Sequence, residues 1–262
     1  FGERVMQEAG LDPLYAPHGI DTETFTPVDN RPEIKEQMGL DPDCFLVGMF
    51  AANKGTPSRK NFDAAIGSFA KFQERIGRGK AVLYLHTNLE DKDGEDVPGI
   101  CKVNGVVPMV PDQYNLALGQ PPSHVATGMQ ACDVVLNPAW GEGFGLTQVE
   151  ANGCGTPVIA TDFSACQDVV PPEGGNWLVG GEPIWTQFGS YQVRASKELI
   201  VECLLQAWEE RGTLESASRR NAARENAMRY EAGKTVDEFW KYVLPEAQRR
   251  FAYTGEARTI FE

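Results

Sequence analysis

The sequence predicts a doubly wound α/β fold, in which helices cover both faces of a parallel sheet. Short runs of β-branched and aromatic residues alternate along the chain with longer segments in which apolar residues recur every three or four positions. The short runs are apolar throughout, which is typical of strands buried on both faces. With 262 residues, of which 42% are hydrophobic, the chain is long enough to bury a core of this kind.

The first strand, helix and strand are predicted within residues 45–87. The segments FLVGMF at 45–50 and AVLYLHT at 81–87 are expected strands, and the apolar residues of 61–76 fall on one face of a helix. The alternation continues with a strand at 104–110, helices at 111–119 and 123–132, a strand at 133–138, a helix at 146–154 and a strand at 156–162. From about residue 190 the pattern predicts helices alone. Pro245 is expected to kink or end the last of them.

Charge and cysteine usage exclude several classes of protein. A net charge of −13 argues against a general nucleic-acid or anionic-membrane surface, since such partners require an excess of Lys and Arg. The six cysteines form no C-x-x-C pair and are interpreted as buried structural thiols in a reducing compartment. No apolar stretch approaches the roughly 20 residues of a membrane helix, so a cytoplasmic location is expected.

The loop after the first strand, AANKGTPSRKNF, is a candidate phosphate site. It places Lys54, Arg59 and Lys60 beside the start of the next helix, for which Asn61 is the expected N-cap. Fixed cations and free backbone N–H groups would converge there on a phosphate or diphosphate. The alternative is an ordinary solvated basic loop.

The passage GEGFGLTQVE at 141–150 is the second candidate. Its glycines let the backbone approach a ligand closely, with Glu142 in the loop and Glu150 one turn into the following helix. The alternative is structural, because Thr147 and Glu150 have the spacing of a capping box, in which the glutamate satisfies backbone N–H groups of its own helix.

The stretch GEGFGLTQVEANGCGTPVIATD resembles the E-x7-E signature of retaining, nucleotide-sugar-dependent glycosyltransferases of the GT-B fold, glycosyltransferase family four, group 1. This large family includes sucrose-phosphate synthases and bacterial mannosyltransferases. NKGTPSRKNF is similar to the family's basic diphosphate loop, and YAPHGIDTETFTP to the end of its first domain, so the resemblance runs from about residue 14 to 245. It implies a Rossmann-like sheet domain with C-terminal helices that binds a nucleotide sugar.

The resemblance also implies roles for individual residues. Glu142 would bind hydroxyls of the transferred sugar, and Lys60 and Arg59 would neutralise the departing diphosphate. Glu150 would bind the ribose hydroxyls. The remaining donor-binding residues that it implies are Asn53, Lys54, His86, Val110, Gly143, Phe144, Gly145, Leu146 and Thr147, with Asp112 near the base. The implied reaction transfers a hexose-type sugar with retention and requires no metal or other cofactor.

Other features receive plainer interpretations. EDKDGED at 90–96 resembles a calcium loop but lacks the glutamate at the twelfth position, so a solvated loop is expected. His18 and His86 are candidate ligand contacts, of which His86 is favoured because it ends a strand at the cleft.

The resemblance divides the chain into three parts. Residues 1–20 correspond to the end of an N-terminal acceptor domain and the linker, residues 21–230 to the nucleotide-sugar-binding domain, and residues 231–262 to a helix that returns toward the acceptor domain. We therefore expect an acceptor domain that is missing from this chain or supplied elsewhere, and an apolar face on the last helix that packs against residues 1–15 and favours a homo-oligomer.

Two other function classes stay open at this level. One is a non-catalytic nucleotide-sugar-binding or assembly subunit, and the other is a sugar-nucleotide epimerase of the same fold. The donor sugar, its base (UDP, GDP or ADP) and the acceptor are not assigned by these residues.

Overall fold

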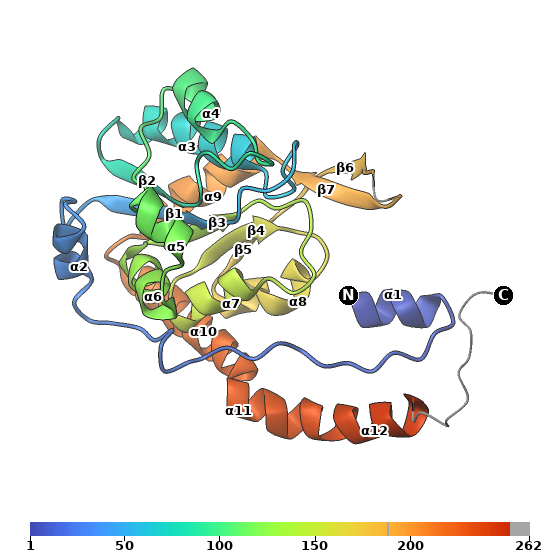
Figure 1. The fold of residues 1–262 in the computed structure, drawn as a ribbon. Coiled ribbons are helices and arrows are strands. Elements are labelled where there is room, and N and C mark those ends of the chain that lie inside the picture. The colour runs from blue at the N-terminus through green and yellow to red at the C-terminus, as the bar shows by residue number, and fades with distance from the viewer. Residues whose placement is uncertain (188, 252–262) are drawn as a thin grey trace.

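The computed structural model describes residues 1–187 and 189–251, and its centre is a parallel sheet of five strands in the order β2-β1-β3-β4-β5 (Figure 1). The strands are β1 (Phe45–Phe50), β2 (Ala81–His86), β3 (Val134–Asn137), β4 (Val158–Thr161) and β5 (Trp177–Val179). Every pairing between neighbours in this sheet is parallel. The predicted fold class is confirmed.

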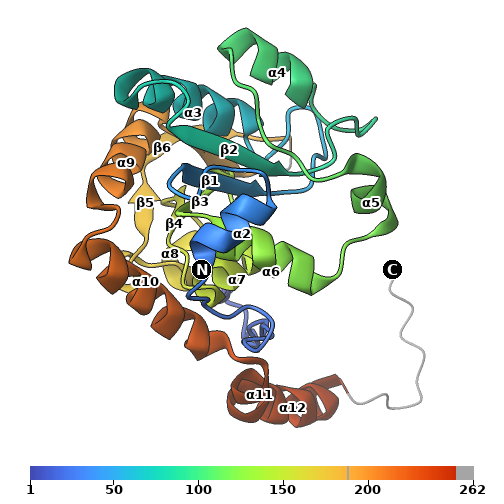
Figure 2. The ribbon, with the colours of Figure 1, turned by 90° about the vertical axis from the view of Figure 1, so that its left-hand side faces the viewer.

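Helices cover both faces of the sheet (Figures 1 and 2). One face carries α3 (Phe62–Ile76), α4 (Val97–Asn104) and α9 (Lys197–Glu210). The other carries α6 (Pro122–Ala131), α7 (Leu146–Gly153) and α10 (Leu214–Ala227).

Strand β1 shows why the predicted strands are apolar throughout. Val47 and Met49 belong to the core under α3 and α9, whereas Leu46 and Phe50 belong to the core under α6 and α7. Because successive side chains of a strand point to opposite faces, a sheet covered on both sides needs an apolar residue at every position.

Shorter elements complete the described chain. They are α1 (Gly2–Glu8), α2 (Arg31–Gln37), α5 (Gln113–Leu118), α8 (Cys166–Val169), the 3-10 turns η1 (Pro172–Gly174) and η2 (Met228–Tyr230), α11 (Ala232–Thr235), the π-helical η3 (Val236–Trp240) and α12 (Lys241–Phe251). The C-terminal helices contact the start of the chain, since the Trp240 indole N–H donates to the Pro17 carbonyl at 3.1 Å and the Tyr15 and Phe239 rings lie 5.5 Å apart.

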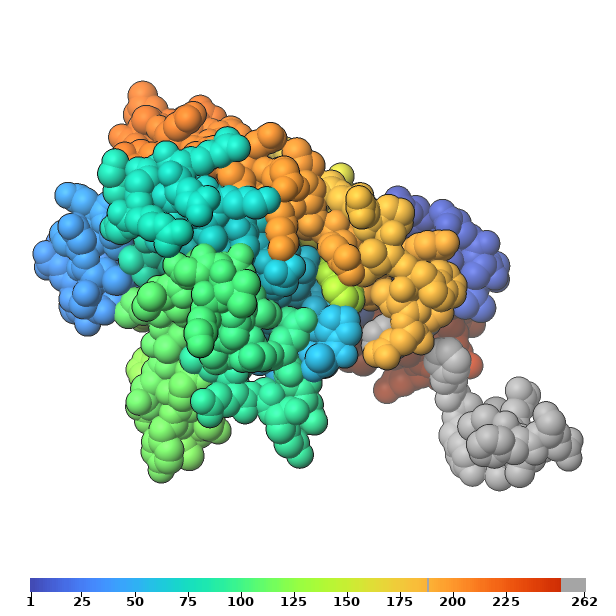
Figure 3. Space-filling view, turned by 90° about the horizontal axis from the view of Figure 1, so that it is seen from above, coloured from blue at the N-terminus to red at the C-terminus, as the bar shows by residue number. Residues whose placement is uncertain are grey.

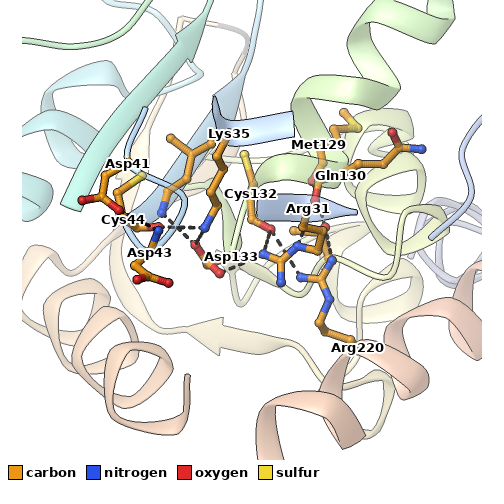
Figure 4. A network of polar contacts seen from close by, with 12 residues as sticks. Arg31, Lys35, Asp41, Asp43, Cys44, Met129, Gln130, Cys132, Asp133 and Arg220 are labelled. Atoms are coloured by element: carbon orange, nitrogen blue, oxygen red, sulfur yellow. Dashed lines mark hydrogen bonds and ion pairs between the residues drawn. The ribbon is translucent and has the colours of Figure 1, made fainter. Parts of the chain in front are cut away.

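A buried ionic network fastens α2 to the amino-terminal edge of the sheet (Figure 4). Asp133, directly before β3, accepts from Arg31 and Lys35, both at 2.8 Å, and from the backbone N–H of Leu46 at 2.8 Å. Burial alone would raise the pKa of Asp133, but Arg31 and Lys35 outweigh it and lower the pKa below its usual value.

The structure corrects three expectations about elements. Residues 104–110 do not form a strand: α4 runs to Asn104, Pro108 has no N–H to donate, and Met109 alone makes a single bridge to Tyr84. The chain is not purely helical after 190, because β6 (Gly181–Trp185) and β7 (Tyr191–Ala195) form an antiparallel hairpin. The last helix does not end at Pro245, where a kink or an end was expected: Pro245 lies inside a helical run that continues without a break from α11 through the π-helical η3 and on to Phe251.

Candidate functional site

The candidate site lies at the carboxyl edge of the sheet, where the strand order reverses. From β1 the chain crosses to β2 on one side and later returns to β3 on the other. Because β1 and β3 are paired in parallel, the loops that follow them, 51–61 and 138–145, emerge side by side. In open α/β sheets this reversal is where ligands bind.

A buried carboxylate joins these two loops. The Glu142 side chain is 6% exposed, and its Oε2 accepts from the Arg59 guanidinium at 2.9 Å while its Oε1 pairs with the Lys60 ammonium. The Glu142 backbone N–H donates to Ser164 Oγ at 2.8 Å, which fixes the loop from the side of β4. Three residues for which the resemblance implied catalytic roles are thus in direct contact.

The loop backbones are also tied together. The Trp140 N–H donates to the Arg59 carbonyl at 2.8 Å, and the Asn61 side-chain amide donates to the Pro138 carbonyl at 3.1 Å. Asn61 is at the N-cap position of α3 as expected, but with a φ of 62° it makes no side-chain capping bond. Its amide is used to hold the two loops in register instead.

The capping-box interpretation of Thr147 and Glu150 is wrong. The N-cap of α7 is Gly145, with a φ of 95°, and Thr147 is already the second helical residue, so its hydroxyl is too far along to cap. Within 1–187 and 189–251, the backbone N–H groups of residues 144–147 donate to no other group. The start of α7 therefore has the free donors and positive dipole end that bind anions.

Glu150 lines a cavity of about 430 Å³ at the carboxyl ends of β1 and β2. It accepts no hydrogen bond from the described residues, and burial raises the pKa of its carboxyl. The cavity is lined by Phe25, Phe50, Ala51, Ala52, His86, Thr87, Asn88, Leu116, Gln120, Pro122, Val125, Thr147 and Glu150. Its size and mixture of apolar walls with a few polar groups suit a small organic ligand.

His86 is placed at this cavity, at the end of β2. Its ring stacks on Phe50 with centroids 5.3 Å apart, and its Nδ1 lies 3.0 Å from the Tyr84 hydroxyl. Burial lowers the pKa of His86, so the neutral ring is favoured.

Three residues expected to bind the donor do not line this cavity. Asn53 is buried and exchanges two hydrogen bonds with the backbone of Glu95, so its side chain is structural. Lys54 pairs with Asp91 at 2.6 Å and lines a different cavity. Val110 directly follows the Met109 bridge, and its partly buried side chain packs against the core beneath α3.

The glycine loop keeps its expected place before α7. Gly143 is exposed at its tip, Phe144 packs edge-on against His18 and Tyr230 at 5.1 and 5.4 Å, and Leu146 begins the helix with a 41% exposed side chain.

Sequence reasoning missed several residues of the cavity, among them Thr87, Asn88, Leu116 and Gln120. Thr87 and Asn88 directly follow β2, so their place after a predicted strand was the signal that could have found them. Leu116 and Gln120 carried no such signal. They reach the cavity because Gln113 fastens α5 to the loop after β2, accepting from the Leu89 N–H at 3.0 Å.

The described residues carry neither a metal-ligand cluster nor a membrane-spanning helix. They hold no cluster of three or more His, Cys, Asp or Glu placed to bind a metal, the 90–96 loop included. None of their helices is long and apolar enough to cross a membrane. The six cysteines are unpaired, and five of them are buried.

Comparison with known proteins identifies the family. The sequence profile described as "Glycosyl transferases group 1" matches residues 46–184, just over half of the chain, including both loops of the site. The chain belongs to the group 1 glycosyl transferases. It is 29% identical over 181 residues to the lipopolysaccharide core biosynthesis mannosyltransferase LpsB of Rhizobium meliloti (strain 1021). That match covers 58% of this chain and 41% of LpsB.

Solved structures agree on a GT-B type fold for this group 1 glycosyl transferase chain. Sucrose-phosphate synthase from Thermosynechococcus elongatus superimposes with a TM-score of 0.73 at 17% identity, over 96% of this chain and 57% of that one. The C-terminal domain of a glycosyl transferase group 1 family protein (LpcC) from Francisella tularensis has a TM-score of 0.62 at 16% identity, over 81% of this chain and 99% of that one. The chain therefore corresponds to the C-terminal half of the fold.

Proposed function

We propose that this chain is the donor-binding half of a retaining glycosyltransferase, which moves a hexose-type sugar from a nucleoside-diphosphate sugar to an acceptor. The observation that carries the proposal is the buried Glu142, fixed between Lys60 and Arg59 and followed by a helix whose first N–H groups donate to none of the described residues. A carboxylate for sugar hydroxyls, two cations and an anion-binding helix start are what a sugar diphosphate requires.

The nucleoside is placed in the 430 Å³ cavity. Ribose hydroxyls donate to Glu150, which has no other hydrogen-bond donor among the described residues, and the base lies against the loop after β2 and helix α5. The two phosphates then reach the N–H groups of residues 144–147 at the start of α7.

The transfer step follows from this placement. The bond between the sugar's anomeric carbon and the phosphate oxygen breaks, and its electron pair passes to the diphosphate, where Lys60 and Arg59 stabilise the growing charge. The acceptor oxygen bonds to the anomeric carbon on the same face, and its proton passes to the departing phosphate oxygen. Glu142 orients the sugar through its hydroxyls, and the proposed step uses no metal and no protein base.

The test is transfer or slow hydrolysis of a labelled sugar nucleotide by the whole protein that contains this chain. Screening UDP-, GDP- and ADP-sugars for a thermal shift would first identify the base, since a ligand that binds only the folded state stabilises it. Binding with neither transfer nor hydrolysis would contradict the proposal and favour a non-catalytic subunit. We assign the acceptor domain of the fold to sequence outside this chain or to a partner. The proposal also includes a cytoplasmic location.

A further inference from the structure

A second cavity, of about 450 Å³, lies between the basic loop after β1 and the hairpin β6–β7. Seen from above, the golden-orange atoms of the hairpin lie beside the blue atoms of that loop (Figure 3). The hairpin is fastened there by its backbone, since the Val193 N–H donates to the Trp140 carbonyl at 3.0 Å. The cavity is thus built from an element to which neither the sequence interpretation nor the donor-site proposal gives a role.

One face of the hairpin forms a wall of this cavity. Ile184 and Gln192 are directly opposite in the strand register, and Arg194 follows Gln192 on the same face. All three line the cavity. Trp140 and Trp185 also line the cavity. Trp185 is next to Ile184 at the end of its strand, its ring lies 5.0 Å from that of Tyr191, and it is 65% exposed. Broad aromatic faces beside amide and hydroxyl groups suit the apolar C–H face and the hydroxyls of a sugar ring.

Three cations line the cavity, and they differ in their ionic partners. Lys54 is paired with Asp91 and Arg59 with Glu142, whereas Arg194 forms no ion pair within 1–187 and 189–251 and lies 5.6 Å from the Trp140 ring centroid. Glu182 is opposite Arg194 in the register but does not line the cavity. No carboxylate is among the described lining residues. An arginine in this setting favours a carboxylate or phosphate, which it can hold with two parallel hydrogen bonds.

We propose that this cavity binds a sugar unit of the acceptor that carries an anionic group, either a phosphate or a carboxylate. The inference rests on the proposed function, because Arg59 connects the two sites: its guanidinium bonds to Glu142 and also lines this cavity. A ligand here would share Arg59 with the donor site. The hairpin therefore contributes to acceptor choice from within the donor-binding half.

The experiment follows the indole N–H signals of Trp185 and Trp140 by nuclear magnetic resonance. The protein is first saturated with the nucleoside diphosphate identified in the thermal-shift screen, so that the nucleotide cavity is filled. Methyl glucuronide, glucose 6-phosphate, neutral methyl glucoside and inorganic phosphate are titrated separately. We expect both anionic sugars to bind about tenfold or more tightly than methyl glucoside, as a charge-assisted hydrogen bond predicts. The stronger of the two anionic sugars identifies the acceptor's group as phosphate or carboxylate.

Variants separate the two parts of the cavity. Arg194→Gln should bring the charged and neutral sugars to nearly equal affinity, and Trp185→Ala should weaken both. Arg211→Gln is the matched control, because Arg211 also stacks on an indole, that of Trp208 at 3.4 Å, but lies outside this cavity. Arg211→Gln should leave the affinities for the charged and neutral sugars unchanged.

The inference would be overturned by equal affinity of the wild type for charged and neutral sugars, by inorganic phosphate binding as tightly as glucose 6-phosphate, or by loss of sugar binding when the nucleotide is present. Nucleotide binding without any sugar binding would overturn it while leaving the donor-site proposal standing. Sugar binding with no affinity for any nucleotide would support the cavity and contradict the donor site.

Discussion

Glu150 is a carboxylate whose burial is compensated by no hydrogen bond from the described residues, and burial raises its pKa. Because the pKa of Glu150 is higher in the folded than in the unfolded state, ionisation of its carboxylate destabilises the fold at pH values above the folded-state pKa. This penalty disappears as the pH falls below the unfolded-state pKa. We expect Glu150→Gln to raise the free energy of unfolding at neutral pH and to weaken nucleotide binding by about tenfold or more. Denaturant unfolding and calorimetric titration measure the two effects.

The matched control for this change is Glu209→Gln, on the exposed side of α9. It should alter neither the free energy of unfolding nor nucleotide affinity. If Glu150→Gln leaves nucleotide affinity unchanged, Glu150 does not bind the ribose hydroxyls.

Lys60 contacts the buried oxygen of Glu142 and is only 16% exposed. Because the diphosphate gains charge only as the glycosidic bond breaks, Lys60→Ala should lower kcat by about 100-fold or more while weakening donor binding much less. Measuring kcat beside the donor's dissociation constant makes the comparison. Equal losses in both would assign Lys60 to ground-state anchoring, and Lys71→Ala, on the exposed Lys71–Glu198 pair, should leave both unchanged.

At the scale of elements, Asp133 holds helix α2 to the sheet. Asp133→Asn leaves Arg31 and Lys35 without their shared carboxylate, and we expect a loss of about 3–5 kcal/mol in the free energy of unfolding. The lowered pKa of Asp133 means that its contribution is present above the unfolded-state pKa and is lost as pH falls through the folded-state value.

Unfolding by denaturant across acidic pH checks this prediction. The wild type should lose stability on acidification more steeply than Asp133→Asn. Asp63→Asn, on the exposed pair with Lys197, should cost at most about 1 kcal/mol. A loss of similar size at both aspartates would contradict the fastening role.

The five parallel strands differ in how far the sequence could predict them. The strands that carry long apolar runs, such as 45–50 and 81–86, are buried on both faces, and this leaves a pattern that can be read directly. The run at 104–110 also contains several apolar residues, yet Pro108 cannot donate a ladder hydrogen bond and only a single bridge forms. The hairpin 181–195 was missed because its strands are short and largely exposed, so they carry no continuous apolar run.

The candidate site was predictable in its loops but not in its contacts. Adjacent parallel strands place the loops with Lys60 and Glu142 at one edge of the sheet. Their direct ion pair depends on side-chain geometry that spacing does not encode. Asn53 shows the converse, since it stands next to Lys54 in the basic loop but its side chain bonds to the backbone of Glu95, 42 positions away.

At the scale of the whole molecule, α1 and α12 lie on the same side of the sheet (Figure 1) and carry exposed apolar residues. Val5 and Met6 are 46% and 49% exposed, and Tyr242 and Leu244 are 73% and 55% exposed. We expect this chain to associate through them, because apolar surface gathered in one region favours self-contact. Light scattering over a concentration series should detect the association.

The double change Met6→Ser and Leu244→Ser should reduce that association. Val107→Ser, which replaces a 92% exposed valine in the loop before the Met109 bridge, should leave it unchanged. A monodisperse monomer at every concentration would show that these side chains do not drive self-contact.

The reversal of strand order between β1 and β3 also determines when the site can form as the chain folds. Glu142 and Lys60 are 82 positions apart, and they meet only after β3 has found β1 across the intervening strand and helices. Closing so long a loop costs chain entropy before any contact repays it, and contacts of this range slow folding. A growing polypeptide therefore carries all of its basic phosphate-loop residues well before it has a site, and acquires the site only when the second half of the sheet is in place.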